Sequence, residues 1–511
     1  MRSWAMQKSQ VPPDRVDQAA RPPGSPGGLP GYLPGDSSAD PIAGRPLDPA
    51  SPTPLFRQLH DRIAAAVLAG RLPAGCRLPS ARGLAAALGV ARGTVEAAYQ
   101  GLAGEGYLVM HGAAGTRVDP ALAPRRPADG DERSAAARPA AAAVADEPAR
   151  PFQMGLPAID AFPYKAWARL AAAAARAIRP DDLVQQPPGG LAALRVEIAR
   201  HLAIARGVTA GPDEVVVTAG FQGALSLVAG ALLRPGDTVT IEDPGYHLAR
   251  DALRHGGARV AGVPVDGDGA DVAAIAAAAP RLAVVTPTHQ FPLGVAMSLG
   301  RRIALLEWAR GAGAFILEDD YDSELRYAGR TIPALKSLDR DGRVLLAGTY
   351  SKVLAPGLRT GYLVVPPALA EAVHAVAARL QPPPAITVQR AIAAFSANGG
   401  LARHVRRMRT LYAGRRTALA EALAAALGPT ARVVAPSGGL HLVVHLPAGT
   451  DDRSLVARAR SHGLAPVALS RLGVERPHAP GLLVGFANVP AAEAAGAAHR
   501  LAAAIAIPTK E

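Results

Sequence analysis

The sequence has a single cysteine, Cys76, among 511 residues. One thiol cannot build an internal disulfide framework, which excludes a disulfide-stapled fold and favours a reducing compartment. Cys76 itself is expected to be a small buried apolar residue. The chain also lacks any uninterrupted apolar run of about 18 residues, and its N-terminus has no signal-peptide apolar core. We therefore expect a cytoplasmic protein with no membrane partner.

Negative charge is in deficit: 42 Asp and Glu face 55 Lys and Arg, which leaves a net charge of +13. A basic chain favours a polyanionic partner, although charge alone does not identify one. Residues 1–150 contribute only +3 of this excess, from 17 basic and 14 acidic residues, and residues 151–511 contribute +10. A nucleic-acid contact confined to the N-terminal part would leave most of the excess unexplained.

The length predicts two or three domains, because a single core rarely serves more than about 250–300 residues. Residues 1–50 are rich in Pro, Gly, Ser and Asp and have almost no apolar periodicity, so we expect a disordered tail. Residues 120–150 consist mainly of Ala, Pro, Arg and Asp and are expected to form a flexible linker. Two structured regions remain, at 51–119 and 151–511.

The first structured region has the pattern of three short helices and a hairpin. Apolar residues recur at helical spacing over 55–67, and Gly70 ends the predicted helix. Residues 78–88 and 91–102 predict two helices around a Gly turn, the form of a helix-turn-helix whose second helix can enter the DNA major groove. Residues 107–118 predict a small hairpin or wing.

The motif L-P-S-x-R-x-L-A in this region, continued by L-G-V-x-R-x-T-V and E-G-Y, resembles the winged-helix domain of the GntR regulators. The resemblance implies binding to a duplex DNA operator. The alternative for the two arginines of the motif is a solvated helix face. The residues implied to contact DNA are Arg82, Arg92, Thr94, His111 and Gly112.

The sequence departs from the GntR pattern on both sides of Arg92. The family usually has Ser before this arginine and a longer polar residue after it, whereas this chain has Ala91 and Gly93. Loss of a Ser cap typically costs about 1 kcal/mol, and Gly inside a helix costs about as much again. We therefore expect the start of the recognition helix to fray until DNA orders it.

From residue 151 onward, short apolar strands alternate with helical segments. This pattern predicts an α/β fold with a mostly parallel sheet covered on both faces. A smaller C-terminal α/β subdomain is expected at about 386–505. Ligands of such sheets bind at the carboxyl ends of the strands. The predicted strands are 215–218, 238–241, 282–285, 314–317, 344–347 and 362–365.

One lysine occupies an unusual place for a solvent-facing side chain. Lys352 lies on the small-residue loop 348–359 between two predicted strands, beside Thr349 and Ser351 and seven residues before Arg359. Such a loop suits a Schiff base to an aldehyde that carries a phosphate, with the amine as nucleophile and the hydroxyls and guanidinium on the phosphate. Pyridoxal 5'-phosphate (PLP) is such an aldehyde. The alternative is a surface loop with an incidental lysine.

Other strand ends carry side chains consistent with the same pocket. Residues 318–324 form a carboxylate cluster, and a PLP ring needs one carboxylate on its pyridinium nitrogen. Magnesium or calcium binding is the rival interpretation of the cluster, although no loop register or partner ligands support it. Gly220 opens a helix directly after a strand, where free amides favour a phosphate. Tyr246 follows another strand and can stack on a ring.

The motifs T-P-T-H-Q-F-P-L-G at 286–294, L-E-D-D-Y-D-S-E at 317–324, the Ser351–Lys352 loop and R-H-V-R-R-M-R at 403–409 resemble fold-type I aminotransferases. Together with the winged helix, they resemble the MocR branch of the GntR regulators. The resemblance implies PLP as cofactor, an aspartate aminotransferase-like fold and a head-to-tail homodimer. The implied contacts are Lys352 in a Schiff base with PLP, Asp319 on the ring nitrogen, Tyr321 near the ring oxygen, Tyr246 stacked on the ring, and Thr349, Ser351, Arg359 and the backbone of Gly220, Phe221 and Gln222 on the phosphate.

The sequence departs from the enzymes at two points. Their Asn-Pro-Thr-Gly loop is Phe-Pro-Leu-Gly at 291–294 here, so the Asn that contacts the ring oxygen is missing. His289 and Gln290 are the candidates to replace this contact. Their carboxylate-binding Arg on a late C-terminal strand has no counterpart in residues 481–486, and only Arg471 and Arg476 shortly precede this strand.

Two functions compete. One is a transcription regulator whose DNA binding is set by PLP or by an amino-compound adduct of it, in control of PLP synthesis or amine metabolism. The other is a PLP-dependent aminotransferase with an accessory DNA-binding domain. The winged helix favours the regulator, and the missing Arg predicts at most a weak transaminase half-reaction. A regulator without cofactor is opposed by the presence of Lys352 and Asp319. Six Arg and no acid over 401–416 predict either a solvated helix face or a second DNA-facing patch.

Overall fold

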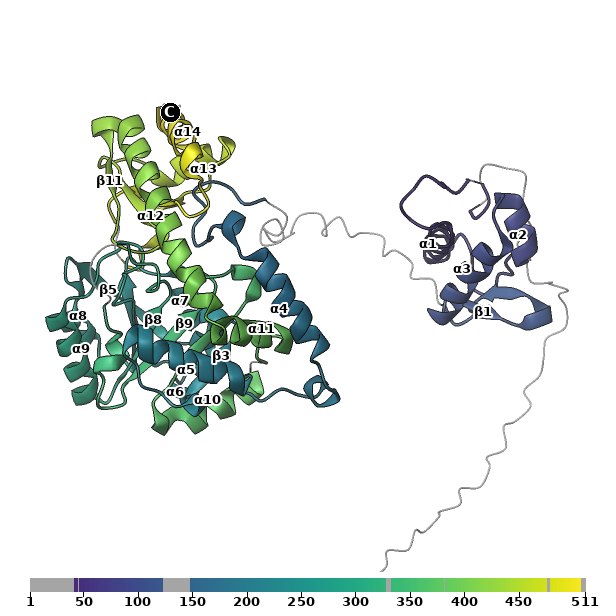
Figure 1. Ribbon diagram of the computed structural model, residues 1–511. Helices are drawn as coiled ribbons and strands as arrows, with labels where there is room; N and C mark the ends of the chain where they lie inside the picture. Colours follow the sequence, from purple (N-terminus) through teal and green to yellow (C-terminus); the bar gives the residue numbers. More distant parts are fainter. Residues whose placement is uncertain are drawn as a thin grey trace, which may run out of the picture. The chain divides into compact units, whose positions relative to one another are not determined.

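The chain divides into two compact units, with the boundary between residues 145 and 146 (Figure 1). The predicted tail over 1–40 and most of the predicted linker lie outside the described residues. None of the helices within the described ranges has the length and apolar character that a bilayer crossing requires. The computed structural model describes residues 41–44, 46–122, 148–327, 332–380, 382–475 and 478–506.

The first unit confirms the predicted helix-turn-helix and wing. Ser80 Oγ caps the second helix by accepting from Gly83 N at 3.1 Å, and Gly89 ends that helix in the left-handed conformation. The two strands of the wing pair antiparallel. The elements are α1 (Leu55–Leu68), α2 (Ala81–Leu88), α3 (Arg92–Gly104), β1 (Leu108–Met110) and β2 (Thr116–Val118).

The core of this unit begins before residue 51. Ile42 and Leu47 are buried in the same apolar cluster as the inner faces of α1 and α3. The Arg62 guanidinium holds this segment by donating to Ile42 O at 2.9 Å. Part of the sequence assigned to the tail is therefore structured. Sequence periodicity did not reveal Ile42 and Leu47, because two isolated apolar residues form no periodic pattern. They pack into a core that consists mainly of residues from other elements.

The second unit is organised around an eight-stranded sheet in the order β3-β10-β9-β8-β7-β4-β5-β6. The run from β9 to β5 is parallel, which confirms the predicted mostly parallel sheet. β10 runs antiparallel to β3 and β9, because the loop between β9 and β10 contains no crossover helix. The strands are β3 (Val215–Thr218), β4 (Thr238–Asp243), β5 (Arg259–Asp266), β6 (Gly269–Ala270), β7 (Leu282–Val285), β8 (Phe315–Asp320), β9 (Val344–Thr349) and β10 (Gly361–Val364).

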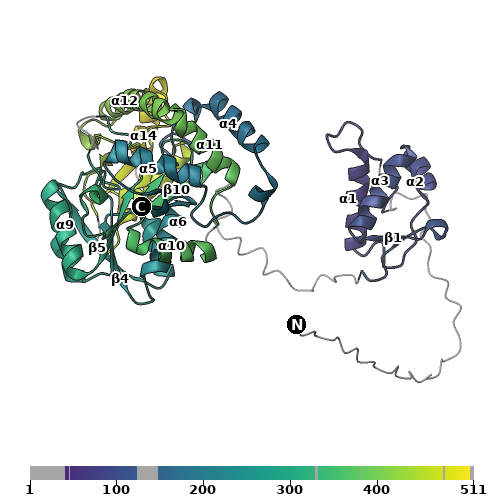
Figure 2. The same ribbon diagram turned by 60° about the horizontal axis from the view of Figure 1, so that its bottom comes forward.

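Helices cover both faces of this sheet (Figure 2). Side chains alternate along a strand, so Val215 and Val217 pack into the cluster with α5 and α11, whereas Val216 packs with α6 and α10. The helices of this part are α4 (Tyr164–Arg176), α5 (Ala192–Arg206), α6 (Gly220–Leu232), α7 (His247–His255), α8 (Val272–Ala278), α9 (Leu299–Ala312), α10 (Pro367–Leu380) and α11 (Ile386–Ala397).

A smaller C-terminal subdomain has an antiparallel sheet in the order β11-β12-β14-β13. Ile392 and Phe395 of α11 pack into the core of the large sheet, whereas Leu419 and Leu423 of α12 belong to the core of the small one. The small subdomain thus begins within α12, later than residue 386, because one long helix passes from one core to the other. Its elements are α12 (Gly400–Leu427), β11 (Arg432–Val434), β12 (His441–His445), α13 (Asp452–Ser461), β13 (Val467–Ala468), β14 (Gly481–Gly485) and α14 (Ala494–Ala506).

Candidate functional site

The topology brings five strand ends to one edge of the large sheet. β4, β7, β8 and β9 are parallel, and β3 runs in the same direction as β9 because both are antiparallel to β10. The carboxyl ends of these strands therefore lie at one edge, where α/β sheets bind ligands. The predicted cofactor residues are at or just after these ends: Gly220, Phe221 and Gln222 after β3, Tyr246 after β4, His289 after β7, Asp319 and Tyr321 at β8, and Thr349, Ser351 and Lys352 at β9.

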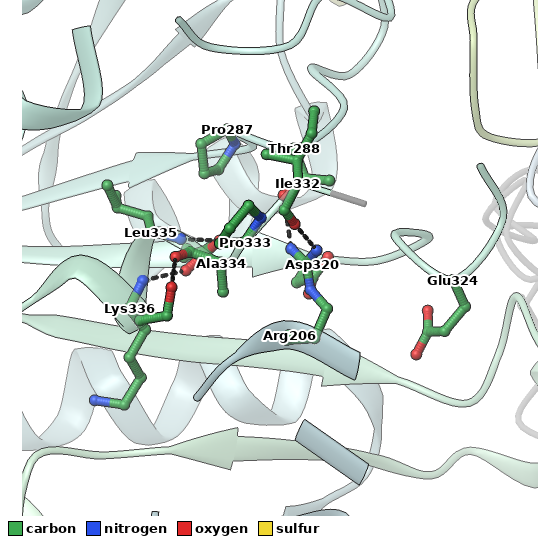
Figure 3. A network of polar contacts seen from close by, with 12 residues as sticks. Arg206, Pro287, Thr288, Asp320, Glu324, Ile332, Pro333, Ala334, Leu335 and Lys336 are labelled. Carbon is green, nitrogen blue, oxygen red and sulfur yellow. Dashed lines mark hydrogen bonds and ion pairs between the residues drawn. The ribbon is translucent and has the colours of Figure 1, made fainter. Parts of the chain in front are cut away.

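Two carboxylates of the 318–324 cluster face away from this edge pocket and stabilise the surrounding chain. Glu318 accepts hydrogen bonds from Leu335 N and Lys336 N, each at 2.9 Å. Asp320 pairs with the buried Arg206 guanidinium at 2.8 Å (Figure 3). Across the residues that the structure describes, no three His, Cys, Asp or Glu side chains gather as a metal site.

Asp319 points to the opposite face of β8 because side chains alternate along a strand. It is buried and lines a pocket with Tyr246 and Phe291. Burial raises the pKa of Asp319 well above its ordinary value, and the Asp320 and Asp322 carboxylates raise it further. Among the described residues its carboxylate has no hydrogen bond or ion pair. A buried carboxylate in this state favours a ligand that offers a positive N–H.

Lys352 lies in the same neighbourhood. Its Nζ donates to Gly155 O at 3.2 Å. Burial lowers the pKa of Lys352, while Asp322 and Asp319 oppose that shift. A lowered pKa increases the share of neutral amine, which is the nucleophilic form. Gly155 has a φ of +71°, which strains a residue with a Cβ, and an added Cβ would stand 2.6 Å from Nζ, so the end of the Lys352 side chain would have to shift. Sequence reasoning missed Gly155, because it lies 197 residues from the lysine.

The predicted phosphate loop is held by its own hydroxyls. Ser351 N donates to Thr349 Oγ1 at 3.1 Å, and the two hydroxyl oxygens are 3.0 Å apart. Arg359 is exposed at the end of the short helix η8 (Pro356–Leu358) and adopts a φ of +47°, which is uncommon for a residue with a Cβ. A Cβ on Gly361 would stand 2.9 Å from Gly220 Cα, so the loop lies against the N-terminus of α6.

Aromatic rings form one wall of the pocket. Tyr246 stands edge-on to Phe221 at 6.0 Å and to Phe291 at 5.9 Å between ring centroids. Burial raises the pKa of the Tyr246 phenol. The Gln222 Nε2 atom is buried and has no partner among the described residues. An unpaired buried amide is costly, so it favours a ligand acceptor.

The structure separates the two candidates for the ring-oxygen contact. The Gln290 amide donates to Pro244 O at 2.9 Å and to a buried Glu242 oxygen at 3.2 Å, away from Tyr321. His289 Nδ1 instead lies 3.0 Å from the Tyr321 hydroxyl and 3.0 Å from Asp322 Oδ2. Its Nε2 is buried without a partner among the described residues. His289 is therefore the side chain next to the tyrosine.

The predicted DNA-contacting residues all lie in the first unit. Arg82 in α2 and Arg92 in α3 are exposed, and Arg92 Nε pairs with Glu96 at 2.7 Å. Thr94 is partly buried in the first turn of α3. His111 and Gly112 are exposed at the turn of the wing. Ala91 occupies the cap position of α3 and makes no side-chain cap bond.

The Arg-rich helix has mostly internal partners. Arg415 pairs with Asp160, and Arg416 donates to Ala435 O at 2.9 Å. Arg406 is the one arginine of the six whose side chain has no partner among the described residues. Arg403, Arg406, Arg407 and Arg409 are exposed, as both a solvated helix face and a second DNA-facing patch require. The remaining donations are Arg403 to Asn398 O, Arg407 to Ala161 O and Arg409 to Glu324 O.

The fold and these pockets define a regulator class in which a winged helix is fused to an aminotransferase-like domain. The family model of aminotransferase class I and II matches residues 159–501, and that of bacterial regulatory proteins of the gntR family matches residues 55–118. The chain belongs to the MocR-type GntR transcription regulators.

Full-length relatives support this assignment. The probable rhizopine catabolism regulatory protein MocR of Rhizobium meliloti is 36% identical over 457 residues, which cover 87% of this chain and 92% of that protein. The pyridoxine biosynthesis transcriptional regulator PdxR of Corynebacterium glutamicum is 35% identical, with coverage of 86% and 94%.

Solved enzymes share the fold of the large unit. A kynurenine aminotransferase of Pyrococcus horikoshii matches with a TM-score of 0.66 and 26% identity over 75% of this chain and 98% of the enzyme. The α-aminoadipate aminotransferase LysN of Thermus thermophilus matches with a TM-score of 0.63 and 29% identity over 69% of this chain and 91% of the enzyme.

Proposed function

We propose that this regulator binds PLP at Lys352 and that PLP, or an amino-compound adduct of it, sets the binding of a homodimer to its operator. One observation carries the proposal. Asp319 has no partner among the described residues and lines a strand-end pocket, and Lys352, whose amine pKa is lowered, lies close enough for its charge to act on Asp319. A pyridine ring nitrogen and an aldehyde are the two groups that such a pair accepts.

The surrounding side chains fit the rest of the cofactor. Thr349, Ser351 and Arg359 and the amides at the start of α6 would hold the phosphate. Tyr246 would stack on the ring, and Tyr321 with His289 would face the ring oxygen. The unpaired Nε2 atoms of Gln222 and His289 would gain partners. When bound, PLP supplies an electron-withdrawing ring and a carbonyl carbon that amines attack.

Regulation is favoured over catalysis by the absence of a carboxylate clamp. β14 carries no Arg, and its Leu483 is fully buried. Arg471 lies on the preceding short helix η10 (Leu469–Leu472), and Arg476 lies outside the described residues. Without a guanidinium fork to orient an amino acid, productive turnover should be poor. The names of the two relatives refer to rhizopine catabolism and pyridoxine biosynthesis, and for this chain we propose amine metabolism and PLP synthesis as the candidate pathways.

The proposal is tested first by spectroscopy. Purified protein with PLP should show a visible band that borohydride removes, and the reduced adduct should map to Lys352 among the five lysines of the chain. Lys352→Ala should lack the band, whereas Lys165→Ala, a change at an exposed lysine, should keep it. A colourless wild type that gains no band with added PLP would refute PLP binding.

The second test separates regulator from enzyme. Operator binding should differ with and without PLP, and incubation with amino acids and keto acids should give little turnover. Multiple turnovers with a physiological pair, together with DNA binding indifferent to PLP, would favour the aminotransferase.

A further inference from the structure

An apolar cluster surrounds Leu483 of β14, the strand that the resemblance to the enzymes matches to the one carrying their carboxylate-binding arginine. Leu483 of β14 is fully buried and pairs with Val443 of β12 and Val467 of β13. Both cross-strand neighbours are apolar, so the position is built for a hydrocarbon side chain. We call this group the β14 cluster; its members are Val443, Leu469, Leu472 and Leu483, with the partly buried Met154, Phe291, Leu293, Val434 and Val467 packed against them.

The β14 cluster is continuous with the proposed cofactor pocket. Phe291 belongs to the cluster, lines the pocket and stands edge-on to Tyr246 at 5.9 Å. Met154 also belongs to it and directly precedes Gly155, whose carbonyl accepts from Lys352 Nζ at 3.2 Å. The cluster is therefore tied to the pocket through Phe291, and through the backbone at residues 154–155 to the carbonyl that Lys352 contacts.

No member of the β14 cluster is a cation. His441 is next to Phe291 at 5.8 Å, and its Nε2 donates to Pro292 O at 2.9 Å. Burial lowers the pKa of His441 to about 4, so its ring is neutral at physiological pH. Arg471 lies between two cluster members on η10 but is exposed. A ligand carboxylate placed against the cluster would lose water without gaining a charged partner.

We propose that the strand-end pocket lined by Phe291 and Asp319 selects primary amines that have an apolar body and no carboxylate. The inference rests on the proposed function, because such an amine enters at Lys352. The nitrogen of the amine forms a bond to the cofactor's aldehyde carbon as the bond from Lys352 Nζ breaks. The two hydrogens of the amine pass to Lys352 Nζ, and nothing is oxidised or reduced. The hydrocarbon body then covers the exposed faces of Phe291 and Met154.

A matched pair of ligands tests this selection. Phenethylamine and L-phenylalanine differ only by the α-carboxylate. The full-length PLP-loaded protein is titrated with each while the visible spectrum is followed, and free PLP is titrated in parallel to correct for the intrinsic reactivity of the two amines. Phenethylamine should bind at least about tenfold more tightly than phenylalanine. Operator binding, followed by fluorescence anisotropy, should respond to phenethylamine at a correspondingly lower concentration.

Substitution of Leu483 in the β14 cluster provides a second test. Leu483→Arg should shift the preference by at least about tenfold toward phenylalanine, because a guanidinium can pair with its carboxylate. Leu483→Met conserves volume and should keep the wild-type ratio. If the Arg variant loses its folded signal, the wild-type ratio alone decides.

Two outcomes overturn the inference and are distinct from each other. A wild type that binds phenylalanine as tightly as phenethylamine refutes the selection, and loss of that binding in Arg471→Ala would assign the carboxylate to Arg471. A wild type that never develops the visible band refutes PLP binding itself, and this inference with it.

Discussion

Two glycines inside α3 test whether the start of the recognition helix limits its stability. Gly93 is exposed in the first turn, and an added Cβ meets no heavy atom within 4 Å. Gly101 lies in the same helix, but an added Cβ would stand 3.3 Å from the His60 ring. His60 is fixed by Asp61 at 2.9 Å and Glu105 at 3.1 Å, so it cannot easily move aside.

Both substitutions to Ala remove the same helix-propensity penalty of about 0.8–1 kcal/mol. Gly93→Ala should keep this gain, whereas Gly101→Ala should lose part or all of it to the contact with His60. Ala91→Ser should add about 1 kcal/mol, because Ala91 has an extended backbone and no cap bond, whereas Ser80 caps α2. A gain of 1 kcal/mol corresponds to roughly 4–8 °C for a unit of this size.

The assay is calorimetry of the full-length variants, with hydrogen exchange of the α3 amides to assign the transition of the first unit. Gly93→Ala should raise that transition and slow exchange in the first turn of α3. If Gly93→Ala is no more stable than Gly101→Ala, and Ala91→Ser changes nothing, the start of α3 is not the weak point and the argument from caps and propensity fails.

Three further outcomes are expected. Arg92→Ala should weaken operator binding by about 1–3 kcal/mol if Arg92 reads a base, or reduce the salt dependence of binding by about one unit of slope if it holds a phosphate. Glu96→Gln should strengthen binding, because it releases Arg92 from its ion pair. Unchanged affinities across a salt series would show that Arg92 is a solvated side chain. Burial raises the pKa of Glu242 to about 7, so the folded state holds this proton more tightly and stability should fall as pH rises from about 4.5 to 7. Glu242→Gln should flatten this pH dependence in thermal melts of the cofactor-free protein. Parallel curves of stability against pH for wild type and variant would contradict this expectation. His289→Ala should weaken PLP binding by about 1 kcal/mol, because the Tyr321 hydroxyl loses its 3.0 Å partner; equal affinity in an absorbance titration would show that Tyr321 does not depend on it.

Strand periodicity made much of the pocket predictable from the sequence. Alternation along β8 places the Asp319 side chain on the other face of the strand from Glu318 and Asp320, and parallel strands have their carboxyl ends at one edge of the sheet. The partners of the other carboxylates were not predictable. Arg206 meets Asp320 across 114 residues, and the choice between His289 and Gln290 depended on side-chain directions that no spacing encodes.

The Arg-rich helix shows a different limit of sequence reasoning. Five of its six arginines donate to backbone carbonyls, of residues 161, 324, 398, 435 and 487. Every residue has a backbone carbonyl, so the sequence does not show which carbonyls accept from these arginines. A charge count over 401–416 therefore gives six cations and none of their acceptors. Hydrogen bonds to neutral carbonyls leave these charges in place, and Arg403, Arg406, Arg407 and Arg409 are exposed, so the helix still presents positive charge to solvent.

Under the proposed function, the two departures from the enzyme pattern should weaken catalysis more than sensing. An aminotransferase must hold both the amino group and the carboxylate of its substrate, because the reacting bond has to be oriented against the cofactor ring. A regulator needs only a difference in ligand affinity between its DNA-binding states, and about 1–3 kcal/mol of coupling is typical. In the proposed site, β14 has no arginine to bind a carboxylate, whereas Lys352 and Asp319 would still bind the amino group and the cofactor. A pocket that binds amines without orienting them is therefore adequate for a switch and poor for turnover.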